Sequence, residues 1–338
     1  MKLSTPRWWY LKAARPAPLL KAALTPPSWL YAWATARRIA RAAPVDPGVP
    51  VVCVGNLTMG GAGKTPVARE ILARLIAAGV KAHGLSRGHG GRLKGPVRVD
   101  PMVHTASDVG DEPLMLARDA PMWVARDRAA GAVAAARAGA QAVVMDDGHQ
   151  NPTVRKTMSL VVVDGETRDD EWPFGDGAVF PAGPMREPLA AGLVRADAVV
   201  ILLPTDLDAP DRRLAKLFEG KTLLTAKLVA AGPPPSGPQL GFAGVAKPWK
   251  VERALKAAGC ELVDFASLPD HAPLDEALLK FLSRRAKRLG AGLITTEKDW
   301  VRLPPAWRPK VTAWPVRARF EDEAALDRLL TALISSSS

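Results

Sequence analysis

The chain has 338 residues, enough for about two domains that each bury a core. Its 46 Lys and Arg residues outnumber its 34 Asp and Glu residues, and the formal net charge of +12 favours an anionic partner: nucleic acid, a membrane surface or a phosphorylated substrate. The only cysteines, Cys53 and Cys260, lie far apart in apolar, strand-like settings, which argues against a disulfide framework and a thiolate metal site.

Residues 1–43 are unusually rich in Trp and Tyr for a segment made mainly of Ala, Leu, Lys, Arg and Pro, and they contain no apolar run long enough to span a bilayer. A helix is predicted after Pro26-Pro27-Ser28. One face of this helix would carry Trp29, Ala32, Trp33, Ala36, Ile39 and Ala40, and the other would carry Arg37, Arg38 and Arg41. This pattern predicts an amphipathic segment that associates with a membrane surface; the alternative is a helix that covers the core of the next domain.

Between residues 44 and 203, strand-like and helix-like runs alternate, which indicates a parallel sheet with covering helices. Strands are expected at 50–54, 80–85, 121–125, 140–145, 159–163 and 196–203. Helices are expected at 65–78, 112–118 and 127–138. The segment 44–203 is therefore predicted to form one α/β domain.

Proline-rich segments at 204–210 and 232–238 indicate a change of unit. Strands are expected at 222–229, 239–245, 261–265, 291–295 and 310–314, and helices at 249–258, 273–289 and 321–334. Residues 204–338 are therefore predicted to form a second, smaller α/β domain.

The stretch from residue 51 to residue 66 combines an apolar strand, a glycine-rich turn and the start of a helix. Backbone N–H groups of such a loop point at an anion, the lysine reaches outer phosphates and the threonine hydroxyl can bind Mg²⁺. Gly63-Lys64-Thr65 completes the pattern G-x-x-x-x-G-K-[ST], but Thr58 stands where the pattern has its first glycine. The stretch predicts a nucleotide phosphate site; the alternative is a plain strand-to-helix turn with a surface lysine.

Acidic side chains follow at two further places. Asp146-Asp147 comes directly after the strand expected at 140–145, where a carboxylate could hold Mg²⁺ opposite Thr65. The alternative there is an acidic cap on a turn. Asp111-Glu112 precedes a helix, and the sequence leaves open whether these carboxylates only favour the helix dipole or face a transferred phosphoryl group.

Two other loops are unusually polar and glycine-rich, which favours a role in a site; the alternative for each is an ordinary surface turn. Residues 86–91, SRGHGG, follow a strand and offer cations and flexible backbone to a phosphate or a sugar. Residues 174–188, FGDGAVFPAGPMREP, end in Arg186-Glu187 and are long enough to shape a pocket.

In their order along the chain, these motifs resemble the tetraacyldisaccharide 4'-kinase family of the lipid A pathway. The motifs are GNLT and GGAGKTP at 55–66, SRGHGG, GDEP at 110–113, DDGHQ at 146–150, FGDG and PAGPMREPL at 174–189, and TTEKD at 295–299. The Thr58 substitution is usual in this family. The resemblance implies a P-loop NTPase-type parallel sheet with covering helices, a second smaller α/β domain and an N-terminal amphipathic helical segment.

The resemblance also implies a function. The expected reaction is the ATP-dependent, Mg²⁺-requiring transfer of the γ-phosphate to the 4'-hydroxyl of tetraacyldisaccharide 1-phosphate, which forms lipid IVA. The expected location is peripheral, on the cytoplasmic face of the bacterial inner membrane. The expected partners are the lipid A disaccharide 1-phosphate substrate and the anionic membrane surface, without nucleic acid and without an obligate protein partner.

The family's roles can be assigned residue by residue. The resemblance places the nucleotide loop at Thr58, Gly60, Gly61, Ala62, Gly63, Lys64 and Thr65. It places the metal shell at Thr65, Asp146 and Glu112, and the catalytic aspartate at Asp111 with His271 as its partner. Asp147 would support the site, and Arg128 is the best match to a basic active-site residue. Because His271 lies in the second domain, the two domains are expected to approach each other when substrates bind.

The chain departs from the family pattern at His149, where phenylalanine is usual, at Asn151, where histidine is common, and at Leu274, where an aromatic residue is common.

Two other classes of protein fit less well. A P-loop GTPase would need a guanine-reading Asn/Thr-Lys-x-Asp, and residues 296–299 have the wrong spacing. A membrane- or nucleic-acid-binding module would leave the glycine loop and the acidic pair without a role.

Overall fold

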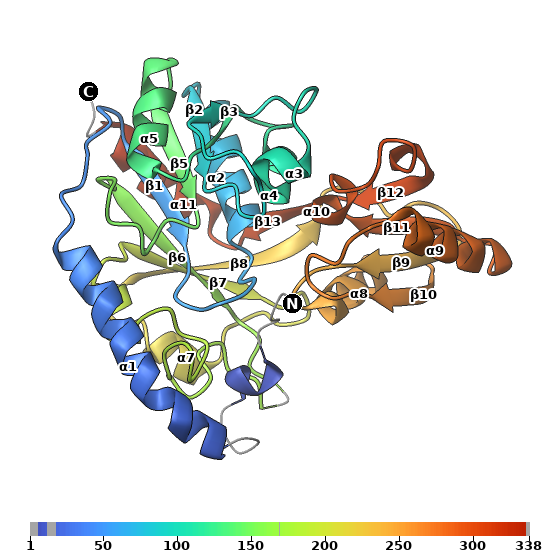
Figure 1. Ribbon diagram of the computed structural model, residues 1–338, viewed down its shortest axis with the longest axis horizontal. Coiled ribbons are helices and arrows are strands. Elements are labelled where there is room, and N and C mark those ends of the chain that lie inside the picture. The colour runs from blue at the N-terminus through green and yellow to red at the C-terminus, as the bar shows by residue number, and fades with distance from the viewer. Residues whose placement is uncertain (1–5, 12–17, 169, 336–338) are drawn as a thin grey trace.

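The computed structural model (Figure 1) describes residues 6–11, 18–168 and 170–335, whose strands form two sheets. The large sheet contains β1 (Val51–Gly55), β2 (Ala82–Ser86), β3 (Val97–Arg98), β4 (Met122–Val124), β5 (Ala142–Asp146), β6 (Met158–Asp164), β7 (Ala198–Leu203), β8 (Thr222–Ala230) and β13 (Val316–Phe320). The small sheet contains β9 (Gln239–Ala243), β10 (Leu262–Ser267), β11 (Gly292–Thr296) and β12 (Val311–Trp314).

The helices connect these strands and cover their faces. They are α1 (Pro18–Ala40), α2 (Lys64–Ala77), α3 (Ala106–Val109), α4 (Asp111–Leu116), α5 (Arg128–Arg137), α6 (Leu189–Val194), α7 (Arg212–Lys216), α8 (Pro248–Ala257), α9 (Glu276–Arg288), α10 (Glu297–Trp300) and α11 (Glu323–Ser335). Short 3-10 turns occupy Arg7–Tyr10 and Arg308–Lys310.

The strand order of the large sheet is β13-β8-β7-β6-β1-β5-β2-β4-β3, and that of the small sheet is β10-β9-β11-β12. All pairs are parallel except β13 with β8 and β3 with β4, which form the two edges of the large sheet. The central strands β1 and β5 are buried along their whole length because helices cover both faces of the sheet. The expected α/β class with a mostly parallel sheet is confirmed.

The register of the central strands places the candidate site. β1 lies between β5 and β6, and Val54 of β1 is opposite Asp146 of β5. Because parallel strands end at the same edge of the sheet, the glycine loop after β1 and the acidic pair after β5 emerge side by side.

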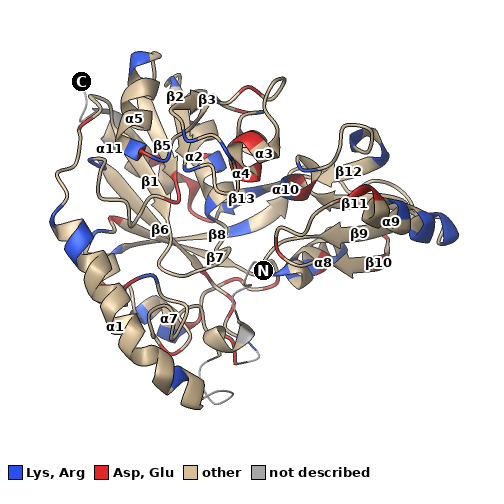
Figure 2. Ribbon diagram, viewed as in Figure 1, with Lys and Arg blue, Asp and Glu red and all other residues tan. Residues whose placement is uncertain are grey.

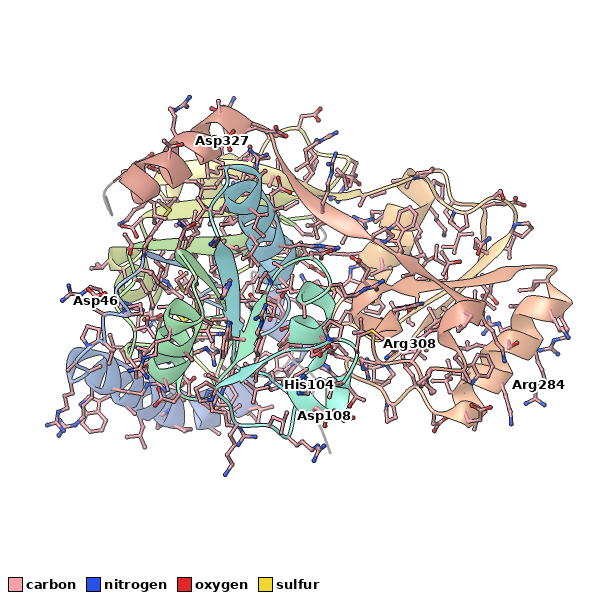
Figure 3. The ribbon with its side chains drawn as sticks, turned by 90° about the horizontal axis from the view of Figure 1, so that it is seen from above. Asp46, His104, Asp108, Arg284, Arg308 and Asp327 are labelled. Atoms are coloured by element: carbon pink, nitrogen blue, oxygen red, sulfur yellow. The ribbon has the colours of Figure 1, made fainter. Side chains whose placement is uncertain are left out.

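Helix α2, which begins at the glycine loop, is held from both sides. Val67, Ile71 and Leu75 pack into the main core together with apolar side chains of α11. On the outside, Arg74 of α2 donates to Asp327 of α11 over 2.7 Å, and Figure 3 labels Asp327 on that helix.

The small sheet is an insertion in the large one. β8 extends the large sheet beyond β7, the chain then builds the small sheet, and β13 returns antiparallel to β8 with Val316 opposite Ala230 (Figure 1). The smaller domain expected at 204–338 thus differs from the observed division, because β8, β13 and α11 belong with the large sheet. The proline-rich residues 204–210 connect β7 to α7, which packs on the same large sheet, and a pairing between distant strands has no local sequence signature.

Helix α1 differs from its prediction in length and in orientation. It begins at Pro18 and continues through Pro26 and Pro27, whose i−4 carbonyls belong to exposed residues and are open to water. The face that packs on the large domain carries buried Ser28 and Thr35, with Tyr31 and Ala32 against a core cluster.

The outer face of α1 is apolar and exposed. Trp29, Leu30 and Trp33 are 69%, 64% and 57% exposed, and the guanidinium of Arg37 lies 5.2 Å from the ring of Trp33. The predicted apolar face is therefore divided, because Ala32 turns inward while both tryptophans remain in solvent. Across residues 6–11, 18–168 and 170–335, no helix is both long enough and apolar enough to cross a membrane.

Candidate active site

The glycine loop joins β1 to α2 in a conformation that requires glycine at residue 63. Gly63 has a φ of 79°, and a Cβ atom there would lie 2.3 Å from Leu202 Cδ1. Lys64 and Thr65 then open the helix, where unpaired backbone N–H groups are available to an anion. The Thr65 hydroxyl donates a 2.9 Å hydrogen bond to Asp146 Oδ2, which joins the glycine loop directly to the acidic pair.

A second loop supports the glycine loop from outside. Met59 N donates to the Pro184 carbonyl over 2.7 Å, and Arg186 N donates to the Leu57 carbonyl over 2.8 Å. The Arg186 side chain adds a 2.9 Å hydrogen bond from Nε to the Thr58 carbonyl. The sequence predicted that this loop shapes a pocket but did not assign Arg186 to the site.

The two carboxylates of the acidic pair have opposite electrostatic environments. Asp146 is fully buried, and burial, followed by the neighbouring charge of Glu112, raises its pKa. Asp147 accepts from Arg186 over 2.7 Å and lies 3.6 Å from Lys64 Nζ. Burial alone would raise the pKa of Asp147, but Lys64 and Arg186 outweigh it and hold that pKa well below its usual range. Asp147 also has a φ of 54°, a strained conformation of the kind found at functional sites.

These donors fit a divalent cation that shares its shell with phosphate oxygens. Asp146 Oδ1 is buried and has no hydrogen-bond partner among the described residues, although it lies beside a threonine hydroxyl and near a second carboxylate, Glu112. In the same part of the chain, no three His, Cys, Asp or Glu side chains converge as a self-contained metal site would. Mg²⁺ typically takes one or two carboxylates and completes its octahedron with water and substrate phosphate, so this donor set suits it.

Arg128 lies behind the acidic pair at the start of α5. Its guanidinium is buried, donates to the Ala125 carbonyl over 2.7 Å and is attracted by the charges of Asp147 and Asp146. Burial lowers the pKa of Arg128 to about 10, so the group is still protonated at neutral pH. Its Nε has no hydrogen-bond partner in the described residues, which leaves a buried cation with donor capacity beside the two carboxylates.

Asp111 and His271 meet across the two sheets. Asp111 is buried at the start of α4, and its Oδ2 lies 3.1 Å from His271 Nδ1. Burial would raise the pKa of Asp111, but the hydrogen bond from His271 and the charge of Lys298 hold it below its ordinary value. His271 has a φ of 56°, and its N–H donates to the Gly244 carbonyl over 3.1 Å. A second imidazole, that of His89 in the SRGHGG loop, lies 6.0 Å from the His271 ring.

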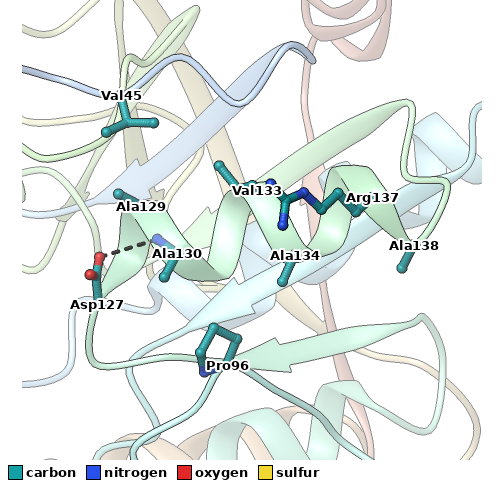
Figure 4. Close-up of a pocket in the computed structure, with 9 residues that line it drawn as sticks. All are labelled: Val45, Pro96, Asp127, Ala129, Ala130, Val133, Ala134, Arg137 and Ala138. Atoms are coloured by element: carbon teal, nitrogen blue, oxygen red, sulfur yellow. Dashed lines mark hydrogen bonds between the residues drawn. The ribbon is translucent and has the colours of Figure 1, made fainter.

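A surface hollow lies elsewhere, on the large domain. It measures about 750 Å³ and runs along α5, where mainly alanine side chains line it together with Val133 and Arg137 (Figure 4). Asp127 at its end accepts a hydrogen bond from Ala130 N and so caps the helix. Its lining contains neither the glycine loop nor the acidic pair, so this hollow is separate from the candidate site.

The structure thus brings together the nucleotide loop, the acidic pair, Glu112, Arg128, Asp111 and His271 at one edge of the large sheet. A glycine-rich loop at the start of a helix, an acidic pair beside it and a carboxylate beside a histidine are typical of P-loop phosphotransferases. The family model described as tetraacyldisaccharide-1-P 4'-kinase matches residues 20–335. The chain belongs to this family.

Similar proteins extend this result. A Caulobacter vibrioides protein called tetraacyldisaccharide 4'-kinase is 68% identical over 330 residues, 98% of each chain. A Rhodospirillum centenum protein of the same name is 49% identical over 339 residues, 98% of this chain and 97% of the relative. The crystal structure of "apo" form LpxK from Aquifex aeolicus in complex with ATP shares the fold, with a TM-score of 0.73 at 24% identity, over 94% of this chain and all of that one.

Proposed function

We propose that this protein transfers the γ-phosphate of ATP to the 4'-hydroxyl of tetraacyldisaccharide 1-phosphate, which forms lipid IVA, and that Asp111 accepts the proton of that hydroxyl. The observation that carries the proposal is the 3.1 Å contact between Asp111 and His271 beside the glycine loop. A sugar hydroxyl is a poor nucleophile at neutral pH, and a carboxylate held by an imidazole can orient it and take its proton.

The donor side consists of the loop from Thr58 to Thr65. Its backbone N–H groups and Lys64 hold the nucleotide phosphates, while Thr65, Asp146 and Glu112 hold the metal ion. When bound, Mg²⁺ supplies positive charge to the phosphoryl oxygens. The hydrogen bond from Thr65 to Asp146 supports this assignment, because it places two metal donors in contact before the ion arrives.

The acceptor side consists of Asp111, His271, Asp147 and Arg128. His271 orients Asp111 and keeps it ionised, so that the carboxylate can act as a base. Asp147 binds Lys64 and Arg186 and so fixes the cations that face the phosphates. Arg128 contributes a buried positive charge behind the acidic pair. Most of the acceleration then comes from positioning and charge.

We further propose three functional segments. Residues 1–43 associate with the membrane, with residues 1–5 and 12–17 outside the described part of the chain. The P-loop kinase domain begins at residue 44, and it includes β8, β13 and α11 in addition to the expected segment 44–203. The small sheet and its helices form the smaller domain, which contributes His271 to the cleft and closes on it when substrates bind.

The proposed location is the cytoplasmic face of the bacterial inner membrane, with peripheral attachment through α1. Exposed Trp29, Leu30 and Trp33 would lie at headgroup depth, and Arg37, Arg38 and Arg41 near the end of the helix would meet anionic lipid. Aromatic rings and basic side chains on one solvent-exposed helix are the features that favour an interface.

The test is phosphate transfer from γ-labelled ATP to tetraacyldisaccharide 1-phosphate. Asp111→Asn should lower kcat by about 10²–10⁴-fold, because it removes the proton acceptor, while nucleotide binding persists. Asp108→Asn is the matched control: Asp108, labelled in Figure 3, caps α3 just before α4 and pairs with Arg92 rather than with a residue of the proposed site. Absence of transfer by the wild-type protein to a competent acceptor would refute the function, and full activity of Asp111→Asn would refute the role of Asp111.

A further inference from the structure

Two neighbouring ion pairs join the smaller domain to the start of α4. His271 faces Asp111, and Lys298 Nζ lies 3.2 Å from Glu112 Oε1. Two consecutive residues of the large domain are therefore each paired with a basic residue of the smaller one. Helices α4 and α10 lie side by side, with acidic residues at the start of α4 (Figure 2).

Both basic residues are attached to one rigid support. Asp299, which is fully buried, accepts from Gly244 N over 3.0 Å and from the Thr296 hydroxyl over 2.8 Å. The carbonyl of the same Gly244 accepts the N–H of His271. Since Lys298 directly precedes Asp299, Lys298 and His271 approach α4 as one unit.

Lys298 lies in a strongly acidic environment. Burial would lower its pKa, but Glu112, Asp111 and Asp270 outweigh burial and raise it, so the ammonium is charged at every working pH. Glu112 in turn acts electrostatically on Asp146. The Glu112 carboxylate is thus paired with Lys298 of the smaller domain and also acts on Asp146, the proposed metal ligand of the large domain.

We propose that Lys298 competes with the divalent metal ion for Glu112, so that metal binding releases one of the ion pairs that join the domains. This inference rests on the proposed role of Glu112 as a metal ligand. Lys298 serves as the counter-ion of Glu112 until the metal arrives, and the other contacts between the domains, among them Asp111–His271, then stay in place. Because coupling between two equilibria is reciprocal, removal of the lysine charge must strengthen metal binding.

The ion pair of Arg69 provides a matched control, because its partner Glu297 lies on α10, the helix that carries Lys298. Arg69 of α2 pairs with Glu297, the residue before Lys298, over 2.5 Å, and also with Asp119 over 2.9 Å. This pair likewise joins the domains, but it does not involve Glu112. Arg69→Met therefore weakens the domain contact without removing the competitor of the metal ion.

The experiment is a Mn²⁺ titration of the full chain, saturated with a non-hydrolysable ATP analogue, in which free Mn²⁺ is measured by electron paramagnetic resonance. Lys298→Met should lower the Kd for Mn²⁺ by about fivefold or more. Lys298→Arg, which keeps the charge, and Arg69→Met should leave this Kd unchanged. Circular dichroism of each variant establishes that it is folded.

The outcomes separate this inference from the proposed function. An unchanged or raised Kd in Lys298→Met would overturn the inference, as would an equal gain in Arg69→Met, because the metal would then respond to domain loosening alone. Glu112→Gln should weaken Mn²⁺ binding. If it does not, the role of Glu112 as a metal ligand fails together with the inference; if only Lys298→Met behaves otherwise than expected, the proposed function stands.

Discussion

We expect the free energy of unfolding of this protein to depend on pH through the buried imidazole of His149. The imidazole is 1% exposed, with Nε2 at 2.9 Å from the Gly192 carbonyl and Nδ1 at 2.8 Å from the Ser159 hydroxyl. A carbonyl can only accept, so Nε2 carries the proton and Nδ1 accepts from Ser159. Burial, aided by the charges of Lys156 and Arg195 and opposed by the hydrogen bond to Gly192, lowers the pKa of His149 from 6.5 to about 4.

The sign and the magnitude follow from this shift. Between the unfolded pKa of 6.5 and the folded pKa of about 4, the unfolded chain binds a proton that the folded chain does not. The stabilisation is complete above the unfolded pKa and is lost as the pH falls towards the folded pKa. Integration of the proton uptake gives a loss of about 2 kcal/mol between about pH 7 and about pH 5.

The assay is urea unfolding, followed by circular dichroism, of the wild type and of His149→Gln across this pH range. Glutamine keeps an N–H for Gly192 but cannot be protonated, so the variant costs some stability at pH 7 through imperfect packing. The wild type should then lose about 2 kcal/mol of unfolding free energy relative to His149→Gln as the pH falls towards 5. A difference that stays constant with pH would refute the assignment of a neutral buried imidazole.

Three further predictions concern other parts of the molecule. Lys64→Met should lower turnover about a hundredfold or more without loss of fold, measured by ATP-dependent transfer and circular dichroism, because it removes the cation nearest the phosphates; near-normal turnover would contradict this. The double variant Trp29→Ser/Trp33→Ser should reduce cosedimentation with anionic phosphatidylglycerol vesicles about tenfold, and unchanged binding would place the contact elsewhere. Burial opposes ionisation of Asp164, but Lys250 and Lys247 lower its pKa from 3.8 to about 2. Its ion pairs are therefore complete above pH 3.8, and Asp164→Asn should cost about 2 kcal/mol at neutral pH, measured by urea unfolding, whereas an unchanged midpoint would argue against the network.

The sequence predicted the central elements of the fold well because their signals are local. β1, β5 and β6 are apolar runs bounded by turns, and α2 has clear helical periodicity after the glycine loop. The pairing of β13 with β8 was missed because the whole small domain lies between them in the chain, and no local pattern records which strands pair. The early start of α1 was missed because Pro26 and Pro27 were treated as breakers, although both lie on the solvent side.

The candidate site shows the same division between local and distant signals. Lys64, Thr65 and Asp146 stand in motifs whose strand context predicts their meeting, and the structure brings them into contact. Arg186 and Lys298 also stood in loops noted from the sequence, but their partners come from segments far away. The inserted small sheet brings Lys298 to Glu112, whereas the loop 174–188 packs on the glycine loop and so places Arg186.

The pairing of β13 with β8 also bears on how the protein is made. The ribosome produces the glycine loop early, whereas the strand that completes its sheet and the helix α11 that packs with α2 emerge only after the whole small domain. Until then β8 presents an unpaired edge, which is a template for wrong pairing between chains. We therefore expect the large domain to remain incompletely folded during synthesis, and to depend on chaperones, while the small domain folds first.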